Sequence, residues 1–300
     1  MFFQKWDGFR YGFNMDVAGA LIEALSGQRL DDFLEERIFA PLGMVDTGFF
    51  VPAPKYHRLS SLWMDSAGAT YMAPVPDAGD HNKGTPAEPV EERKRGLTEL
   101  DFRWSKDPET RRRTPVFTEQ VSRRPSLLSG GDGLCGTAHD FGRFCEMLMH
   151  GGRVPGGGGK QILSSHTLRF MRQNHLVKDG KPVGFDELAV EGYTEATAQS
   201  GAGFGIGFSV IMDQALTRQP DSVGTFSWSG AASTNFICDP AENLFVVFMT
   251  ALRFRDDRIL PLKPKLLQHV YACIADDPQA TGPAEADARE SSIPRPLSRL

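Results

Sequence analysis

The chain has 300 residues, of which 40% are hydrophobic and 24% are charged, and its formal net charge is −5. This composition is typical of a globular protein of one or two domains, and the mild negative charge argues against nucleic-acid binding. No apolar stretch reaches the roughly 18 residues that a membrane span needs, and residues 1–11 lack the apolar core of a signal peptide. We therefore expect a cytoplasmic protein that does not bind membranes.

The first 50 residues predict two helices. The first helix is predicted because apolar residues recur at helical spacing: Val17, Ala20, Leu21, Ala24 and Leu25. Asp16 could cap its start, and Gly27 should end it. A second helix is predicted from Leu30 or Asp31, and Pro41 limits it because proline cannot continue the backbone ladder.

The middle of the chain changes in composition and then returns to helical patterns. Residues 74–125 are rich in proline, glycine and runs of charge, which predicts a loop-rich insertion. A glycine-rich turn over 129–134 precedes a helix that Thr137 caps, with Asp140 as an approximate capping box and Gly151-Gly152 as the end. A shorter helix is predicted around 165–173.

The last third predicts antiparallel strands and a final helix. Four β-rich runs between 203 and 252 are separated by turns so short that consecutive strands must be antiparallel neighbours. A helix fits Leu262 to Ile274, whereas the tail 276–300 has too few large apolar residues to pack and is expected to be disordered. The predicted organisation is one domain over 1–275 followed by that tail.

The cysteines do not indicate a metal site. Cys135, Cys145, Cys238 and Cys273 are far apart, and they form no Cys-x-x-Cys pair. We interpret all four as buried thiols, and we expect neither a metal nor an organic cofactor.

Two motifs carry the chemical signal. Tyr11-Gly12-Phe13-Asn14 opens the first helix, and Trp228-Ser229-Gly230 lies in a β-rich run. Between them, in a consistent order, lie Pro41-Leu42-Gly43-Met44 and Gly130-Gly131-Asp132-Gly133-Leu134. This ensemble resembles the serine β-lactamase-related esterases, often called family VIII esterases, and the resemblance runs from about Tyr11 to Ala251.

The resemblance implies an α+β fold of the β-lactamase/transpeptidase type, in which helices flank an antiparallel sheet beside a mostly helical subdomain. In that family a serine attacks an ester or lactam carbonyl and forms an acyl-enzyme that water hydrolyses. Tyr11 matches the tyrosine that acts as general base toward the serine. Ala231 matches the residue whose backbone N–H completes the oxyanion hole.

The resemblance also implies a substrate preference. Trp228, Ser229 and Gly230 match the substrate-binding motif that usually reads Lys-Thr-Gly in β-lactamases, on a strand whose edge could pair with substrate. An indole cannot attract the carboxylate of a β-lactam antibiotic as a cation would. Small carboxylic esters, or related amides, are therefore the expected substrates. We expect no nucleic-acid partner. We interpret Asn14 as a helix-start residue, with substrate binding as the alternative.

The nucleophile of this family is missing from the chain. The Ser-x-x-Lys motif that supplies it does not occur in the 300 residues. We favour a truncated serine hydrolase whose missing N-terminal part holds that motif, so the fold should be incomplete there, expose apolar faces and tend to self-associate. The alternatives are a non-catalytic binding or scaffold protein and hydrolysis by another residue. Ser229 has neither a lysine three residues later nor a Gly-x-Ser-x-Gly motif around it, so it is not expected to be a nucleophile. His139-Asp140 fits a helix start better than a catalytic triad.

Overall fold

The computed structural model describes residues 12–60, 63–65, 97–99, 105–106, 113–114, 124–188, 200–230, 232–250, 252–253 and 262–274. Its centre is a five-stranded sheet in the order β11-β10-β9-β8-β7. These strands are β7 (Ala202–Phe204), β8 (Ser209–Ile211), β9 (Phe226–Ser229), β10 (Asn235–Asp239) and β11 (Leu244–Phe248). Every neighbouring pair is antiparallel. The prediction of antiparallel neighbours is confirmed, although the first predicted run divides into β7 and β8.

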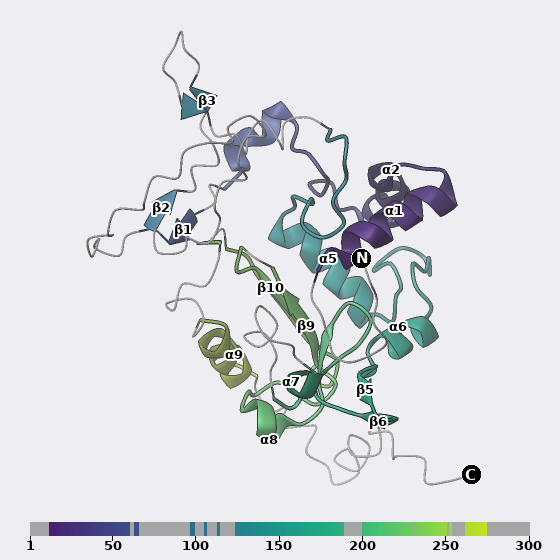
Figure 1. Ribbon diagram of the computed structural model, residues 1–300, viewed down its shortest axis with the longest axis vertical. Helices are drawn as coiled ribbons and strands as arrows, with labels where there is room; N and C mark the ends of the chain where they lie inside the picture. Colours follow the sequence, from purple (N-terminus) through teal and green to yellow (C-terminus); the bar gives the residue numbers. More distant parts are fainter. Residues whose placement is uncertain are drawn as a thin grey trace, which may run out of the picture.

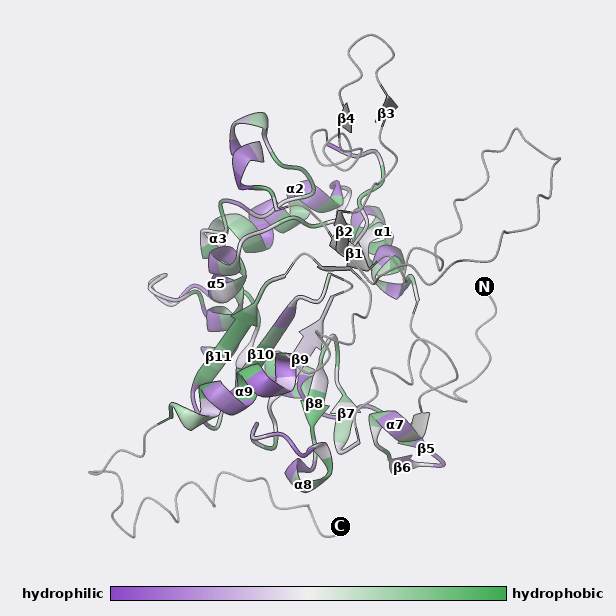
Figure 2. Cartoon of the chain, turned by 90° about the vertical axis from the view of Figure 1, so that its left-hand side faces the viewer, coloured by the Kyte–Doolittle hydropathy of each residue, from purple (hydrophilic) through white to green (hydrophobic). Residues whose placement is uncertain are grey.

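Helices cover both faces of this sheet (Figure 1). Helix α5 (Ala138–Met149) packs on β10 and β11. Phe236 and Cys238 on β10 belong to the core cluster that α5 completes. Because side chains alternate along a strand, Ile237 and Asp239 point to the opposite face. Helix α9 (Leu262–Ala272) lies there, since Tyr271 donates a hydrogen bond of 2.6 Å to Asp239. Figure 2 shows that β8 and β11 are strongly hydrophobic strands.

The first predicted helix is α1 (Asn14–Ser26), which ends at Gly27 in the left-handed conformation as expected. Asp16 is not its cap. The helix begins before Asp16, with Phe13 in the cap position and no side-chain cap hydrogen bond. The Asp16 carboxylate instead accepts a hydrogen bond of 2.6 Å from the Ser129 hydroxyl.

The second predicted helix is divided into three parts. It comprises α2 (Leu30–Leu34), the π-helical turn η1 (Glu35–Phe39) and α3 (Ala40–Leu42). Pro41 lies in the first positions of α3, where its missing N–H is tolerated, and Gly43 ends the helix in the left-handed conformation. The helix therefore ends within two residues of Pro41, as predicted, but the sequence did not indicate the π-turn.

The helices after the glycine-rich turn agree with the prediction. Thr137 caps α5 by accepting the Asp140 N–H, and Gly151 and Gly152 follow the helix with positive φ. The Asp140 carboxylate does not complete a capping box, because it accepts the Asp46 N–H at 2.7 Å and the Thr47 hydroxyl at 3.0 Å. Helix α6 (Ser165–Met171) has the cap Ser164.

Shorter elements complete the described chain. Helical turns are η2 (Ala53–Arg58), α7 (Phe185–Leu188) and α8 (Gln214–Thr217). Strands β12 (Leu252–Arg253), β1 (Trp63–Asp65) and β2 (Leu97–Glu99) form a second sheet. Two-stranded ribbons pair β3 (Ser105–Lys106) with β4 (Arg113–Thr114) and β5 (Val177–Lys178) with β6 (Lys181–Pro182).

Several predictions lie largely outside the described residues. Short strands β2 to β4 fall within the predicted loop-rich insertion at 74–125, of which most is not described, and the tail 276–300 is not described at all. The domain boundaries therefore stay predictions. Among the described helices, none is both long and apolar enough to cross a bilayer.

The prediction that all four cysteines are buried is wrong for two of them. Cys145 and Cys238 are fully buried between α5 and β10, but Cys135 is partly exposed and Cys273 is exposed. Cys273 directly follows the last residue of α9. All four thiols are free.

Candidate functional site

The second sequence motif lies at the end of strand β9, close to the turn into β10. Trp228 pairs with Phe236 and Ser229 with Asn235. Directly opposed residues of an antiparallel pair point to the same face. Trp228 therefore shares the α5 face with Phe236, whose ring centroid is 5.3 Å from that of Phe141 on α5. Ser229 points to the opposite face, so the two side chains of the motif serve different sides of the sheet.

Strand β9 is an interior strand, which corrects the expectation of an edge. Its ladder with β10 extends over Trp228 and Ser229, but its ladder with β8 contains Phe226 and Ser227 and ends there. The motif thus continues beyond the β8 ladder. At Ser229 and Gly230 the side of β9 that faces away from β10 has no ladder partner in β8, which gives this short stretch the character of an edge.

A tight turn fixes the end of the motif. Gly230 donates a backbone hydrogen bond of 2.9 Å to Thr234, and Ser233 donates one of 2.9 Å back to Gly230. A Cβ atom on residue 230 would lie 2.6 Å from the Thr234 hydroxyl oxygen, so the turn favours glycine here. Ala231, the predicted oxyanion-hole residue, is the next residue and lies outside the described residues.

Trp228 belongs to an aromatic cluster that joins three elements. Its ring meets Phe204 of β7 edge to face at a centroid distance of 4.9 Å. The ring centroid of Phe185 on α7 is 5.3 Å from that of Phe204 and 6.4 Å from that of Trp228. Phe185 is almost fully buried. Edge-to-face geometry is the favoured arrangement of aromatic rings. The cluster holds the indole in place and surrounds it with apolar surface.

The first motif is described in part. Tyr11 lies outside the described residues. Asn14 is the first residue of α1 and is exposed, in agreement with its interpretation as a helix-start residue. Its role in substrate binding stays a prediction.

The glycine-rich turn at 129–133 holds the entry of α1. A Cβ atom on Gly130 would lie 2.4 Å from the Met15 carbonyl oxygen, so the two backbones are in close contact. The Ser129 hydroxyl lies 2.6 Å from Asp16 and 2.7 Å from Asp132. This turn therefore fixes the helix start that directly follows Tyr11. The sequence showed a turn here, but no local pattern connects Ser129 with Asp16, which is 113 residues away.

His139 and Asp140 do not form a triad in the described part of the chain. The Asp140 side chain is buried and is used by Asp46 and Thr47, whereas the His139 side chain is 78% exposed. His139 Nδ1 is 3.6 Å from the carboxylate. The Asp140 carboxylate therefore joins the start of α5 to the 46–47 loop, and it does not cap the helix as expected.

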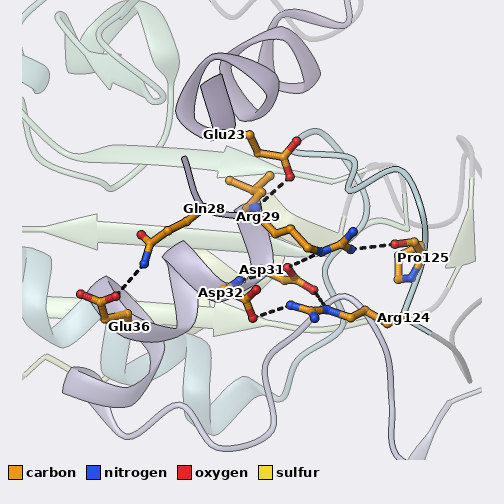
Figure 3. A network of polar contacts seen from close by, with 9 residues as sticks. Glu23, Gln28, Arg29, Asp31, Asp32, Glu36, Arg124 and Pro125 are labelled. Carbon is orange, nitrogen blue, oxygen red and sulfur yellow. Dashed lines mark hydrogen bonds and ion pairs between the residues drawn. The ribbon is translucent and has the colours of Figure 1, made fainter. Parts of the chain in front are cut away.

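A cavity of about 410 Å³ lies between α2, the 45–52 loop and residues 135–137, and none of the predicted site residues lines it. Most of the charged residues that line it form ion pairs. Arg124 bonds to Asp31 and Asp32, and Arg29 donates to Asp31 and to the Pro125 carbonyl (Figure 3). Burial disfavours the Asp31 carboxylate, but hydrogen bonds from Arg124 and Arg29 prevail and lower its pKa. We interpret this network as the clamp that holds the chain at 124–125 against α2.

A second ion-pair group lines the same cavity. Hydrogen bonds from Arg58 and Lys55 lower the pKa of the Asp46 carboxyl below its usual range. Within the described ranges, no three His, Cys, Asp or Glu side chains lie close enough to hold a metal ion.

Comparison with known proteins gives a family match over most of the chain. Residues 8–265 match the family model described as Beta-lactamase. Protein Rv1367c of Mycobacterium tuberculosis is 28% identical over 249 residues, which are 82% of this chain and 49% of that protein. Esterase EstB of Burkholderia gladioli is 27% identical over 271 residues, which are 90% of this chain and 56% of that protein. The chain thus spans about half the length of the curated relatives it matches.

Solved structures show the same fold. Simvastatin synthase LovD from Aspergillus terreus has a TM-score of 0.62 at 16% identity, covering 89% of this chain and 56% of that chain. EstCE1, described as a hydrolase with promiscuous acyltransferase activity, has a TM-score of 0.56 at 23% identity, covering 88% of this chain and 56% of that chain. The expected α+β fold of the β-lactamase type is confirmed.

Proposed function

Because the chain belongs to the beta-lactamase family, we propose that it provides the proton-transfer and substrate-binding part of a serine hydrolase that cleaves small carboxylic esters through an acyl-enzyme. The observation that carries this proposal is the end of β9. The Trp228-Ser229-Gly230 motif runs past the β8 ladder into a tight turn, so its last residues lie at an open strand end. Backbone groups in such a position can bind a substrate carbonyl.

The proposed roles follow from the chemistry of each residue. Tyr11 exchanges the proton with the attacking serine, and the Ala231 N–H stabilises the oxyanion. Trp228 binds the substrate beside Phe204 and Phe185. The serine itself comes from outside residues 1–300, since Ser-x-x-Lys is absent from them. The length of the relatives, about twice that of the matched part, leaves room for such a segment.

An ester preference is supported by the apolar surroundings of Trp228. Edge-to-face packing against Phe204 keeps the indole fixed. A β-lactam carboxylate next to this cluster would lose hydration without gaining a cation from residue 228. A small neutral ester has no such penalty, so its transition state is reached at lower cost.

Activity tests of this proposal need a form that includes the serine. We define the extended form as residues 1–300 preceded by the polypeptide encoded directly upstream in the same genome. The extended form should hydrolyse p-nitrophenyl butyrate much faster than the β-lactam nitrocefin, and Trp228→Lys should shift the ratio toward nitrocefin. A wild-type extended form that prefers nitrocefin would contradict the ester assignment. An unchanged ratio in the variant would contradict the charge argument.

A further inference from the structure

Asn174 lies shortly after helix α6 and binds three separate parts of the chain with one side-chain amide. Its Oδ1 accepts the backbone N–H groups of Leu176 and Phe204 at 3.1 Å each, and its Nδ2 donates a hydrogen bond of 2.8 Å to the Val183 carbonyl. An asparagine oxygen has two lone pairs, so both are used here. These partners fix the orientation of the amide, because a turned amide would place its own N–H groups against two N–H donors.

The hydrogen bond to Phe204 holds an edge of the central sheet. Strand β7 is the last strand in the sheet order, and Phe204 is its last residue. The segment after α6 binds both backbone groups of Phe204, because the N–H donates to Asn174 and the carbonyl accepts the His175 N–H at 2.9 Å. Gly203 admits this contact, since a Cβ atom there would lie 2.4 Å from the Asn174 Cγ. The end of β7 is therefore held against this segment.

The hydrogen bond to Val183 holds the segment that leads into α7. Val183 also donates its N–H to the Leu176 carbonyl at 3.2 Å, which closes the base of the β5-β6 ribbon. Phe185 begins α7 two residues later. Figures 1 and 2 place α7 beside this ribbon. Asn174 thus connects the two segments that carry Phe204 and Phe185.

These two phenylalanine rings are the ones that meet Trp228 in the aromatic cluster. The Phe204 ring packs edge to face with the indole, and the Phe185 ring lies near both. The three residues come from separate elements, so their packing requires that β7 and residues 183–185 keep a fixed separation. A shift of either segment would change the contact of a ring with the indole.

We propose that Asn174 is a positioning residue for the substrate site, which sets the orientation of the Trp228 indole by holding Phe204 and Phe185 on either side of its amide. This inference rests on the proposed function, in which the substrate binds beside these three rings. Loss of the amide would leave the Phe204 N–H and the Val183 carbonyl without their partners. Because an unsatisfied polar group in a partly buried place is costly, the two segments would move until water reaches them.

The first experiment follows Trp228 by fluorine NMR in the 300-residue chain labelled with 5-fluorotryptophan. The chain has four tryptophans, and Trp228→Phe identifies the resonance of residue 228. We expect Asn174→Ala to shift or broaden that resonance and to leave the other three unchanged. An unchanged Trp228 resonance would overturn the proposal. So would an equal change of all four resonances, since Asn174 would then support the fold without positioning the indole.

Two further variants decide the question if Asn174→Ala does not fold. Asn174→Asp has nearly the same size and keeps the acceptor for the Phe204 N–H, but it places a second oxygen against the Val183 carbonyl. Gly203→Ala keeps the amide and displaces it by the added Cβ atom. Both variants should move the Trp228 resonance, and a wild-type resonance in both would overturn the proposal.

Ser164→Ala is the matched control. The Ser164 hydroxyl caps α6 by accepting the Thr167 N–H at 2.9 Å, so this variant also removes a side-chain acceptor from a backbone donor. It should lower the urea midpoint of unfolding, as Asn174→Ala should, but leave the Trp228 resonance unchanged. The same resonance change in Ser164→Ala would mean that any loss of stability moves the indole, and it would overturn the specific role of Asn174.

Kinetics of the extended form test whether this geometry serves substrate binding. Asn174→Ala should raise KM for p-nitrophenyl butyrate by about tenfold, the upper range for the loss of an aligned aromatic contact. The kcat should stay nearly unchanged, because the rings bind substrate and transition state equally. A lower kcat at unchanged KM would overturn the role in substrate binding. If the wild-type extended form hydrolyses no ester, the proposed function is wrong, and the Trp228 resonance still decides whether Asn174 positions the indole.

Discussion

Replacing Tyr271 by phenylalanine tests how α9 is held on the sheet. The Asp239 carboxylate is fully buried at the end of β10. It accepts the Tyr271 hydroxyl at 2.6 Å and the backbone N–H groups of Ser222 and Ala241 at 3.0 Å each. Tyr271→Phe removes one donor to a buried charge and keeps the ring. A hydrogen bond to a charged group contributes about 1.5–3 kcal/mol, so the free energy of unfolding at pH 7 should fall by that amount.

The pH dependence of this loss follows from the carboxylate. Burial raises the pKa of Asp239, but hydrogen bonds from Tyr271 and Ser222 prevail, and its pKa is lower than the ordinary 3.8. A carboxyl whose pKa is lowered by folding stabilises the protein above its unfolded pKa, and this contribution is lost as the pH falls through the folded pKa. The difference between the wild-type protein and Tyr271→Phe should therefore be largest near neutral pH and shrink below about pH 4.

Urea unfolding at pH 7 and at pH 3.5 measures both effects. Tyr56→Phe is the control, because the Tyr56 hydroxyl makes no hydrogen bond to another described residue. The wild-type protein and Tyr56→Phe should unfold at similar urea concentrations, and Tyr271→Phe at a lower one. An unchanged midpoint for Tyr271→Phe at pH 7, or a difference that stays constant down to low pH, would refute the reasoning.

Three further predictions concern the site and its supports. Gly230→Ala should destabilise the chain by about 1–3 kcal/mol through overpacking against Thr234, and the loss should be smaller in a Thr234→Ala background, which a double-mutant cycle in urea can measure. Asp140→Ala should lower the free energy of unfolding by about 2–4 kcal/mol, because two partly buried donors of the 46–47 loop lose their acceptor, and a wild-type thermal midpoint would contradict this. In the extended form Tyr11→Phe should lower kcat for p-nitrophenyl butyrate by about 10²–10⁴-fold at unchanged Tm, and equal activity would reject Tyr11 as the general base.

The elements of the fold could be predicted because their signals are local. Thr137 and Gly151 mark the ends of α5, and short turns between β-rich runs required antiparallel pairing. The orientation of α1 could not be predicted in this way. Its apolar spacing gives a helix with one apolar face, but Gly19 and Ile22 are the residues that meet the Leu30 cluster, so Val17, Leu21 and Leu25 are exposed.

The site was predicted in part for the same reason. The Trp228 motif is a continuous run of residues, so its strand and turn were visible in the sequence. Its interior place in the sheet was not, since pairing with β8 depends on residues 209 and 210. Likewise, Phe185 and Phe204 meet Trp228 only after three separate elements come together. Contacts between remote residues leave no periodic signal in a single sequence.

The most direct measurement is hydrolysis of p-nitrophenyl butyrate by the purified 300-residue chain beside the extended form, with the folding of both confirmed by a cooperative thermal transition. We predict turnover by the extended form alone, because we propose that the serine lies outside residues 1–300. Turnover by the folded 300-residue chain would mean that another residue of this chain is the nucleophile, and it would contradict the proposed mechanism.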